Sequence, residues 1–335
     1  MKVLVTGGSS LIGAGVANAL QQRGDSVSVF QRSTSTSVSP DVEQVLGDVR
    51  DASAVRAALD GCDAVVHLAA KVGVVGTWQD YESINVDGTR HVVEGIRALG
   101  IRRFVHVSSP SVAHGGESIV GGGADPAVLD HGSAWYPTSK ALGERLALEA
   151  ASEACGVVVI RPHLVWGPGD TQLVGRIIER ARAGRLALVG GGRALVDSTY
   201  VDNAVSSLVA ALDAVGPGAI CSGKAYVIAN GEPRPIRELI EGFCRAADVA
   251  FAPRDVPLAV ARPLGSAIEW AWPRLGRDDE PPLTRFIARQ LGTAHWFDPR
   301  PARDDLGWTP AVTIDDGLIA LAAGFGARMP NDHLE

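Results

Sequence analysis

Two side chains four positions apart, Tyr136 and Lys140, have the types and spacing needed for proton transfer. On a helix this spacing puts both side chains on one face, one turn apart. A lysine ammonium and any second cation bound nearby both favour a phenolate, so we expect the pKa of Tyr136 to be lowered toward neutral pH. Because the chain has only four tyrosines, a chance pairing at this spacing is rare. A tyrosine on a helix surface is the alternative.

Hydroxyl and amide groups accompany this pair. The serines of Val107-Ser-Ser-Pro-Ser111 follow an expected strand, so one of them could stabilise charge on a substrate oxygen. Serines that only form the turn are the alternative. Asn85 begins Asn85-Val-Asp-Gly-Thr89 at an expected helix entrance. It either holds a water or the lysine in the site or caps the helix, and the two interpretations are equally supported.

A glycine-rich turn at the N-terminus predicts a dinucleotide site. An expected strand runs directly into Thr6-Gly-Gly-Ser-Ser-Leu-Ile-Gly13, and an expected helix follows. In this context the backbone approaches a pyrophosphate, which binds at the helix N-terminus. The usual middle glycine is replaced by Ser10. The predicted cofactor contacts here are Gly7, Ser10, Leu11, Ile12 and Gly13.

The end of the second strand indicates which cofactor binds. NAD sites place a carboxylate there for the ribose 2′-hydroxyl. This strand ends Val29-Phe-Gln-Arg-Ser33, with Phe30 where an NAD enzyme has an acid. Arg32 could instead clamp a 2′-phosphate, so NADP(H) is favoured over NAD(H). A solvated surface arginine is the alternative.

Two later segments complete the expected cofactor site. Asp48 and Val49 follow a short apolar run and suit contacts with the adenine edge. The small residues of His67-Leu-Ala-Ala70 follow another expected strand and leave room for a ribose. We therefore add Leu68, Ala69 and Ala70 to the predicted cofactor contacts.

The elements that position these residues alternate between strands and helices, as in an α/β doubly wound parallel sheet, the NAD(P)-binding Rossmann fold. We expect a dinucleotide-binding domain at residues 1–165, with a returning strand near 225–230. A smaller, partly interleaved substrate domain is expected at 166–328. The glycine-rich stretch 115–132 is either a lid or a surface loop. The expected strands are 3–6, 26–30, 64–68, 104–108, 157–161 and 225–229, and the helices 14–23, 52–59, 86–99, 138–154, 173–183 and 236–247.

Composition narrows the function classes. The chain has 335 residues, 46% of them hydrophobic, and a net charge of −7 without a basic stripe, which disfavours nucleic acid as a partner. No apolar run approaches the roughly 18 residues that predict a membrane span. The four cysteines lack any C-x-x-C pair, so we expect free thiols and a cytoplasmic setting. They are Cys62, Cys155, Cys221 and Cys244.

These motifs, in this order and at this spacing, resemble the extended short-chain dehydrogenases/reductases over nearly the whole chain. The resemblance implies a hydride-transferring enzyme in which Ser109 polarises a carbonyl, Tyr136 donates the proton and Lys140 is its partner. It also adds Asn85 to the catalytic residues and Lys140 and Pro162 to the cofactor contacts, and requires no metal. The residues that carry it are Thr6-Gly-Gly…Gly13, His67–Ala70, Asn85–Thr89, Ser108–Ser111, Tyr136…Lys140 and Arg161-Pro…Gly167-Pro168.

Within this superfamily the chain resembles the 3-beta-hydroxysteroid dehydrogenase/isomerase branch, and inside it the bacterial 2-alkyl-3-oxoalkanoate reductases of long-chain olefin and β-lactone biosynthesis. That likeness implies NADPH-dependent reduction of a 2-alkyl-3-oxo acid to the 3-hydroxy acid, a homodimer, and association with other enzymes of the pathway. The branch rests on Tyr200–Asn203, Asn230–Pro233, Pro282–Phe286 and Ala302-Arg…Leu306–Pro310, and the reductase likeness on Ala69–Gly73…Trp78, Trp166–Asp170 and Gln290–Trp296.

A substrate of this kind needs one cation for its carboxylate and apolar walls for its alkyl chains. Alternatives are a sterol 3-hydroxy dehydrogenase, which could decarboxylate a 4-carboxysterol, a nucleotide-sugar epimerase, and an NADP-sensing protein without chemistry. The apolar second domain speaks against the epimerase, and the serine, tyrosine and lysine together speak against the sensor. Candidate cations are Lys71, Arg161, His163 and Arg193, and candidate walls are Trp270, Trp272, Phe286, Trp296 and residues 256–268.

Overall fold

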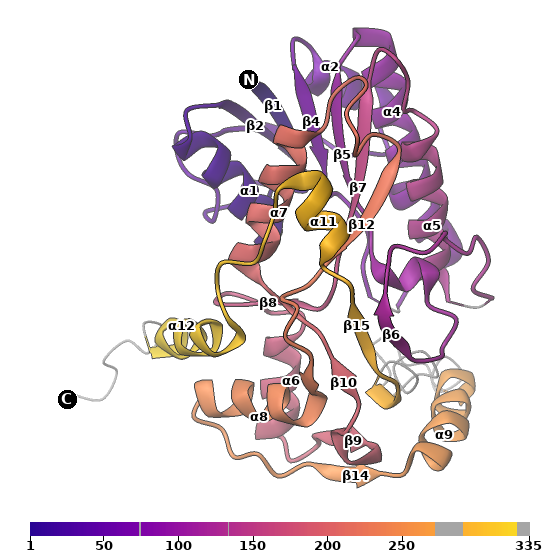
Figure 1. Cartoon of the computed structure of the whole chain (residues 1–335), viewed down its shortest axis with the longest axis vertical. Coiled ribbons are helices and arrows are strands. Elements are labelled where there is room, and N and C mark those ends of the chain that lie inside the picture. Colours follow the sequence, from indigo (N-terminus) through magenta and orange to yellow (C-terminus); the bar gives the residue numbers. More distant parts are fainter. Residues whose placement is uncertain (74, 133, 272–290, 327–335) are drawn as a thin grey trace.

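The computed structural model describes residues 1–73, 75–132, 134–271 and 291–326. A seven-stranded, fully parallel sheet dominates the fold, in the order β12-β7-β5-β4-β1-β2-β3 (Figure 1). The strand order reverses beside β1, as in dinucleotide-binding sheets. The expected α/β fold class is therefore confirmed. The strands are β1 (Lys2–Thr6), β2 (Ser26–Gln31), β3 (Glu43–Leu46), β4 (Ala64–His67), β5 (Arg103–Val107), β7 (Gly156–Pro162) and β12 (Lys224–Ile228).

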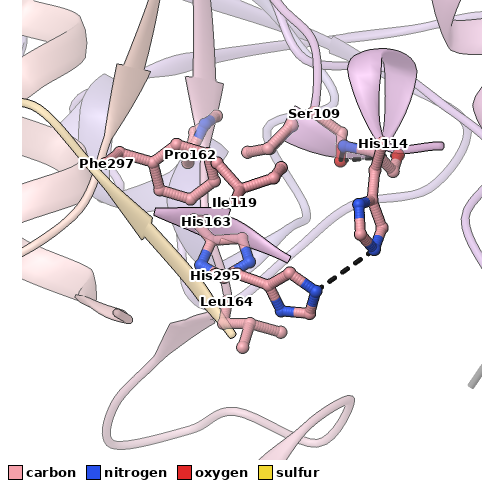
Figure 2. Close-up of a pocket in the computed structure, with 10 residues that line it drawn as sticks. Ser109, His114, Ile119, Pro162, His163, Leu164, His295 and Phe297 are labelled. Atoms are coloured by element: carbon pink, nitrogen blue, oxygen red, sulfur yellow. Dashed lines mark hydrogen bonds between the residues drawn. The ribbon is translucent and has the colours of Figure 1, made fainter. Parts of the chain in front are cut away.

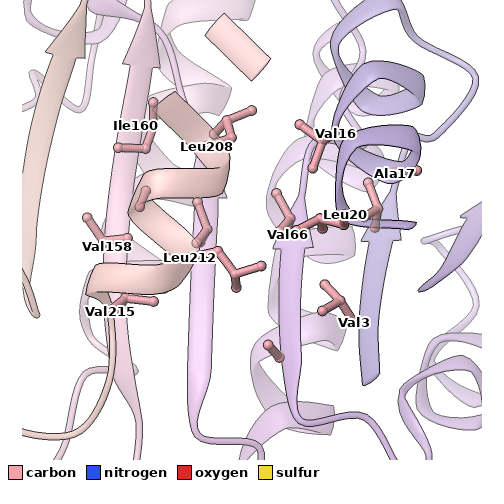
Figure 3. Close-up of a cluster of buried hydrophobic side chains, with 14 of the residues drawn as sticks. Val3, Val16, Ala17, Leu20, Val66, Val158, Ile160, Leu208, Leu212 and Val215 are labelled. Carbon is pink, nitrogen blue, oxygen red and sulfur yellow. The ribbon is translucent and has the colours of Figure 1, made fainter. Parts of the chain in front are cut away.

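Helices cover both faces of this sheet because successive strand residues point to opposite sides. On one face α1 (Leu11–Gln22) and α7 (Val201–Ala214) bury their apolar stripes on β1, β4 and β7 (Figure 3). On the other face α2 (Ala52–Leu59), α4 (Gly88–Leu99) and α5 (Trp135–Leu148) pack on the alternate residues. Two apolar cores thus hold the carboxyl ends of the strands in fixed positions.

A smaller body lies beyond the carboxyl edge of the sheet (Figure 1). Its four-stranded sheet, β13-β10-β15-β6, joins strands from distant parts of the chain. A separate apolar core, including Trp166, Ile240 and Phe243, holds this body together. Its elements are β6 (Ile119–Gly122), β8 (Val165–Trp166), α6 (Val174–Arg182), β9 (Ala187–Val189), β10 (Leu195–Val196), β11 (Thr199–Tyr200), β13 (Arg234–Pro235), α8 (Ile236–Ala246), β14 (Arg254–Val256), α9 (Leu258–Ala271), β15 (His295–Phe297) and α12 (Ile314–Gly326). Helix α11 (Arg300–Leu306) returns to the large sheet, where it packs on α7 and β12.

Several elements differ from expectation. Helix α1 begins at Leu11 rather than at residue 14, because the Ser10 side chain caps it. Helix α5 runs from 135 to 148 instead of 138 to 154. The glycine-rich stretch contains β6, which pairs with β15, so it is neither a simple loop nor a free lid. The division expected at residue 165 falls in β8 and remains a prediction.

In the part of the chain that the structure describes, none of the helices combines the length and apolar character needed to span a bilayer. The four cysteines are buried and make no disulfides.

Candidate active site

The glycine turn after β1 is shaped by close backbone approaches. Gly7 has φ +74°, and a Cβ there would lie 2.8 Å from the Ala69 amide nitrogen. A Cβ on Gly13 would lie 2.3 Å from the Gly7 carbonyl oxygen. Both positions therefore require glycine. The turn leaves the N-terminus of α1 open to an anion, which fits the pyrophosphate of a dinucleotide.

Ser10, the departure from the glycine pattern, stabilises this turn. Its backbone has φ −76° and ψ 156°, a conformation that does not need glycine. The Ser10 hydroxyl accepts from the Gly13 amide at 3.1 Å and donates to the Gly7 carbonyl at 2.8 Å. A serine at this position thus caps the helix without closing the turn. Leu11 and Ile12 form the first residues of α1 behind it.

The end of β2 corrects one expectation from the sequence. Phe30 is buried against Gly47 on the opposite side of the strand, so it does not stand where an NAD enzyme has its acid. The side chain that reaches the glycine turn belongs to Gln31, whose Oε1 lies 3.0 Å from where a Gly8 Cβ would be. The cause is the alternation of side chains along a strand. Arg32, the next residue, is exposed.

The Gln31 amide has a fixed orientation. Gln44 Oε1 accepts from the Ser35 amide at 2.8 Å, and Gln44 Nε2 donates to the Ser35 carbonyl at 3.1 Å. Gln31 Nε2 must therefore be the donor in its 2.7 Å bond to Gln44 Oε1. The buried Gln31 Oε1 is left without a hydrogen-bond partner in the described structure. An orphaned acceptor beside a glycine turn fits a hydroxyl of a bound nucleotide.

The other predicted cofactor contacts lie along the same sheet edge. Asp48 is held by Arg50, which keeps the pKa of that carboxyl low. The carbonyl oxygen of Val49 contacts His91 Nδ1 at 2.9 Å. After β4, residues Leu68, Ala69 and Ala70 are partly buried, and the Ala69 amide donates to Thr6 Oγ1 at 3.1 Å. These bonds fix the segment after β4 against the glycine turn.

Asn85 lies within a π-helix, Glu82–Asp87, that precedes α4. Its Oδ1 accepts from the Lys71 amide at 2.7 Å, and its Nδ2 donates to the Lys71 carbonyl and to Ser139 Oγ. The helix-capping interpretation is wrong, because the side chain makes these bonds instead and sits inside the helical segment. Asn85 connects the segment after β4 with α5, next to Lys140, and π-helical turns of this kind are frequent at functional sites.

Ser109, Tyr136 and Lys140 come together at the carboxyl edge of β5. The Tyr136 hydroxyl lies near Ser109, close enough for that side chain to affect its ionisation. Ser109 Oγ accepts from Ser111 Oγ at 2.9 Å. Lys140 Nζ donates to the Val107 carbonyl at 2.7 Å, which anchors the ammonium under the site. The structure thus places the three predicted catalytic side chains in one cluster.

Burial has the largest effect on the ionisation of this cluster. Burial raises the pKa of Tyr136, and the nearby Ser109 side chain offsets only part of that effect. Burial also lowers the pKa of Lys140 to about 8, with Glu144 opposing. In the protein alone, burial therefore raises rather than lowers the pKa of Tyr136. The lowering expected with a lysine ammonium and a nicotinamide cation beside the ring remains a prediction. The phenol is kept protonated, as a proton donor requires.

A small pocket adjoins the serine. It encloses about 60 Å³, space for a few waters or one carboxylate group. Its walls come from both bodies of the fold, since β7 supplies Pro162 and β15 supplies Phe297. Figure 2 shows three imidazoles grouped in it. The lining residues are Ser109, Pro110, Ser111, His114, Ile119, Pro162, His163, Leu164, His295 and Phe297.

The four candidate cations for the substrate carboxylate lie in different environments. Arg161 is buried in an ion pair with Glu144 and donates to the Asp125 carbonyl, so it is fully engaged. Lys71 lies over the Tyr81 ring, and Arg193 is exposed. Only His163 of the four lines the pocket. Among the candidate apolar walls, Trp272, Phe286 and the Trp270 side chain lie outside the described residues, and Trp296 packs by Gly121.

Sequence reasoning missed His114, His295 and Gln31 as residues of the site. His295 lies in the Gln290–Trp296 segment, which the sequence marks as distinctive but gives no role. His114 stands alone before a glycine-rich stretch, and no local pattern connects it with a residue 181 positions later. A glutamine at a strand end carries no charge signal.

Comparisons with known proteins agree with this geometry. Residues 3–229 match the model of the NAD dependent epimerase/dehydratase family. The chain is 44% identical to a 2-alkyl-3-oxoalkanoate reductase of Stenotrophomonas maltophilia, over 98% of this chain and 100% of the relative. It is 34% identical to a protein of the same name from Shewanella oneidensis, over 95% and 85%. It is 30% identical to a 3-beta-hydroxysteroid dehydrogenase of Mycolicibacterium neoaurum, over 95% of this chain and 89% of the relative.

Solved structures show the same fold. An epimerase from Methanothermobacter thermautotrophicus superposes with a TM-score of 0.78 at 21% identity, covering 97% of this chain and 92% of that chain. A UDP-glucuronic acid 4-epimerase from Bacillus cereus, in complex with NAD, superposes with a TM-score of 0.73 at 21% identity, covering 98% and 99%.

Proposed function

This chain belongs to the NAD-dependent epimerase/dehydratase family, the extended short-chain dehydrogenases/reductases, and we propose that it reduces the 3-keto group of 2-alkyl-3-oxoalkanoic acids with NADPH. The product is the 2-alkyl-3-hydroxy acid, an intermediate suited to long-chain olefin or β-lactone biosynthesis. The observation that carries the proposal is the cluster of Ser109, Tyr136 and Lys140 beside a dinucleotide turn. The 44% identity to a reductase of that name supports the substrate class.

The chain's own residues account for the proton transfer. When bound, the reduced nicotinamide supplies the hydride that reaches C3 of the substrate. Ser109 donates a hydrogen bond to the 3-oxygen, and the Tyr136 hydroxyl delivers its proton to the same atom as charge develops there. Lys140, held by the Val107 carbonyl, stabilises the phenolate that remains. Asn85 acts as a positioning residue, because its amide joins Lys71 to Ser139 rather than touching Lys140.

NADPH is the proposed cofactor, bound by Gly7, Ser10 to Gly13, Asp48, Val49, Leu68 to Ala70, Lys140 and Pro162. Arg32 is exposed at the end of β2, next to Gln31, where a 2′-phosphate would lie within its reach. The β2 end carries no carboxylate that would repel that phosphate. Gln31 Oε1 suits a ribose hydroxyl.

The cofactor proposal is tested with Arg32→Ala. One charge-assisted phosphate contact at an exposed site contributes about 1–1.5 kcal/mol, so KM for NADPH should rise roughly tenfold. KM for NADH should stay unchanged, because NADH has no 2′-phosphate. Steady-state kinetics with both cofactors measures this. An equal rise for both would show that Arg32 supports the fold of the turn, and would refute the role in phosphate binding.

The substrate proposal is tested by following NADPH absorbance with a 2-alkyl-3-oxoalkanoic acid, a 3-ketosteroid and a nucleotide sugar as separate substrates. We expect oxidation of NADPH with the first. A Tyr136→Phe variant should lose on the order of 10²-fold or more in kcat, since it lacks the proton donor. No turnover of the acid would overturn the substrate class, and near-full turnover by the variant would overturn the mechanism.

A sterol is the second candidate substrate, because a 3-beta-hydroxysteroid dehydrogenase is 30% identical over 95% of this chain. The same catalytic residues would serve a bulky 3-oxygenated sterol, including one that loses a 4-carboxyl group. We also propose a homodimer and association with other enzymes of the same pathway. Light scattering of the purified protein tests the homodimer. Light scattering of its mixture with an enzyme that makes the 2-alkyl-3-oxo acid by condensing two acyl chains tests the association.

A further inference from the structure

Three histidines from distant parts of the chain meet in the pocket beside Ser109. His163 follows β7, His114 follows a short 3-10 helix at Pro110–Ala113, and His295 lies in β15. The His114 and His295 rings are 4.6 Å apart, and the His163 and His295 rings 5.9 Å apart. Figure 2 shows the three rings grouped around one region, with the His114–His295 hydrogen bond dashed. The proposed mechanism uses none of them.

The backbone around His163 is held on several sides. Its amide donates to the Ile228 carbonyl at 2.9 Å, and its carbonyl accepts from Thr199 Oγ1 at 2.7 Å. The next residue, Leu164, has φ +42°, a conformation that non-glycine residues rarely adopt. Such strain persists where surrounding bonds determine the backbone, and it is typical of functional sites. The His163 ring is therefore aimed into the pocket by its framework.

Hydrogen bonding fixes the proton on His163. Its Nδ1 lies 2.6 Å from the Asp197 carbonyl oxygen, which can only accept, so Nδ1 carries the hydrogen. In the neutral ring, Nε2 is then an acceptor, and it becomes a donor when the ring gains a proton. His295 Nε2 contacts both Thr293 Oγ1, at 2.8 Å, and His114 Nε2, at 3.1 Å. The cluster can thus take up a proton at more than one nitrogen.

The surroundings keep the His163 and His295 rings neutral before a ligand arrives. Burial lowers the pKa of His163 to about 4 and of His295 to about 3, and the imidazoles oppose one another's charge. The Asp197 carboxyl accepts hydrogen bonds from the amides of Gly231 and Glu232. The contact between Asp197 and His163 is made by the Asp197 backbone carbonyl. None of the ten described lining residues is an acid. The missing counter-charge would come from an anion in the pocket.

We propose that His163, His114 and His295 bind the carboxylate of the substrate, and that one imidazole takes up a proton as the carboxylate enters. This inference rests on the proposed function. In a 3-oxo acid the carboxyl carbon and the keto carbon are separated by one carbon, roughly 2.5 Å apart. A carboxylate site must therefore adjoin the serine that contacts the keto oxygen. The pocket lined by both Ser109 and the histidines meets this requirement.

The cluster is not arranged for a metal ion, since no group of three or more His, Cys, Asp or Glu among the described residues could hold one. An organic anion is therefore the ligand that the observations favour. Recognition by an imidazolium also explains how the site could select the free acid over its ester. The ester has no negative charge, so it cannot form an ion pair with the protonated ring.

The test uses the stable reverse substrates, a 2-alkyl-3-hydroxyalkanoic acid and its methyl ester, with NADP⁺. We expect wild-type enzyme to prefer the acid, and His163→Gln to lower kcat/KM for the acid at least tenfold, about 1.4 kcal/mol. The variant should keep its kcat/KM for the ester, and His114→Gln should behave alike. His131→Gln, the same change outside the pocket, should leave the acid-to-ester ratio unchanged. Equal losses for acid and ester in His163→Gln would overturn the proposal.

Calorimetry supplies a readout that does not depend on turnover. Binding of the hydroxy acid at pH 7, measured in phosphate and in Tris, should show uptake of about one proton, and binding of the ester none. Acid binding without proton uptake would overturn the proposal. Wild-type enzyme that oxidises neither compound would overturn the proposed function instead. In that case the carboxylate site is tested by calorimetry with decanoate and methyl decanoate. Uptake of about one proton on binding of decanoate alone supports the site, and binding of decanoate without proton uptake refutes it.

Discussion

Replacing Glu144 with glutamine should strongly destabilise the protein. Glu144 on α5 and Arg161 on β7 form a two-point ion pair in which both side chains are 2% exposed. Arg161 Nη1 also donates to the Asp125 backbone carbonyl, but this neutral acceptor cannot balance the positive charge of the guanidinium. Glu144→Gln therefore leaves a buried arginine without its counter-ion, which costs about 3–5 kcal/mol.

Urea unfolding followed by circular dichroism measures this cost as a fall in the midpoint at constant slope. The matched control is the double variant Glu144→Met with Arg161→Met, which removes both charges and keeps the volume. That variant should recover most of the loss, because replacing a whole buried pair by apolar side chains is often neutral. If Glu144→Gln cost less than about 1 kcal/mol, the reasoning from an uncompensated buried charge would be refuted.

Three further results follow from the site. The kcat/KM for ketone reduction should fall as pH rises through about 8, because Lys140 then loses the ammonium that stabilises the tyrosine's phenolate; a flat profile to pH 10 would contradict this. Ser10→Ala should destabilise the protein by about 1 kcal/mol through loss of the helix cap, while a thermal shift below 1 °C would argue against the cap. Gly13→Ala should abolish tight NADPH binding, since its Cβ would lie 2.3 Å from the Gly7 carbonyl; fluorescence titration checks it, and unchanged affinity would count against the turn's role.

The sequence predicts the parallel sheet and the catalytic cluster because both depend on local patterns. Continuous apolar strands identify the sheet, and the four-residue spacing of Tyr136 and Lys140 fixes their common face. Ser109 is identified by its position after a strand and by family resemblance. Each of these signals is contained in one short stretch of sequence, so no tertiary contact is needed to interpret it.

Other parts of the site could not be predicted, because they depend on long-range pairing. The strands β6 and β15 have four and three residues and depend on pairing with strands far away in the chain, since β15 lies between β6 and β10. Their pairing brings His114 and His295 into contact. The identity of the residue facing the glycine turn depends on the register of β2, and a shift of one residue exchanges Phe30 for Gln31. The direction of the Tyr136 pKa shift depends on burial, which spacing does not reveal.

The pairing of β6 with β15 also has a consequence for the order in which the chain can become functional during synthesis. The strands that form the cofactor edge, β1 to β5, β7 and the closing β12, are complete once residue 228 has been made. The histidine pocket needs His295, which is added nearly seventy residues later. Cofactor affinity can therefore arise on the growing chain before any acid is recognised, and early docking of the nucleotide would stabilise the first half while the second half is still being added.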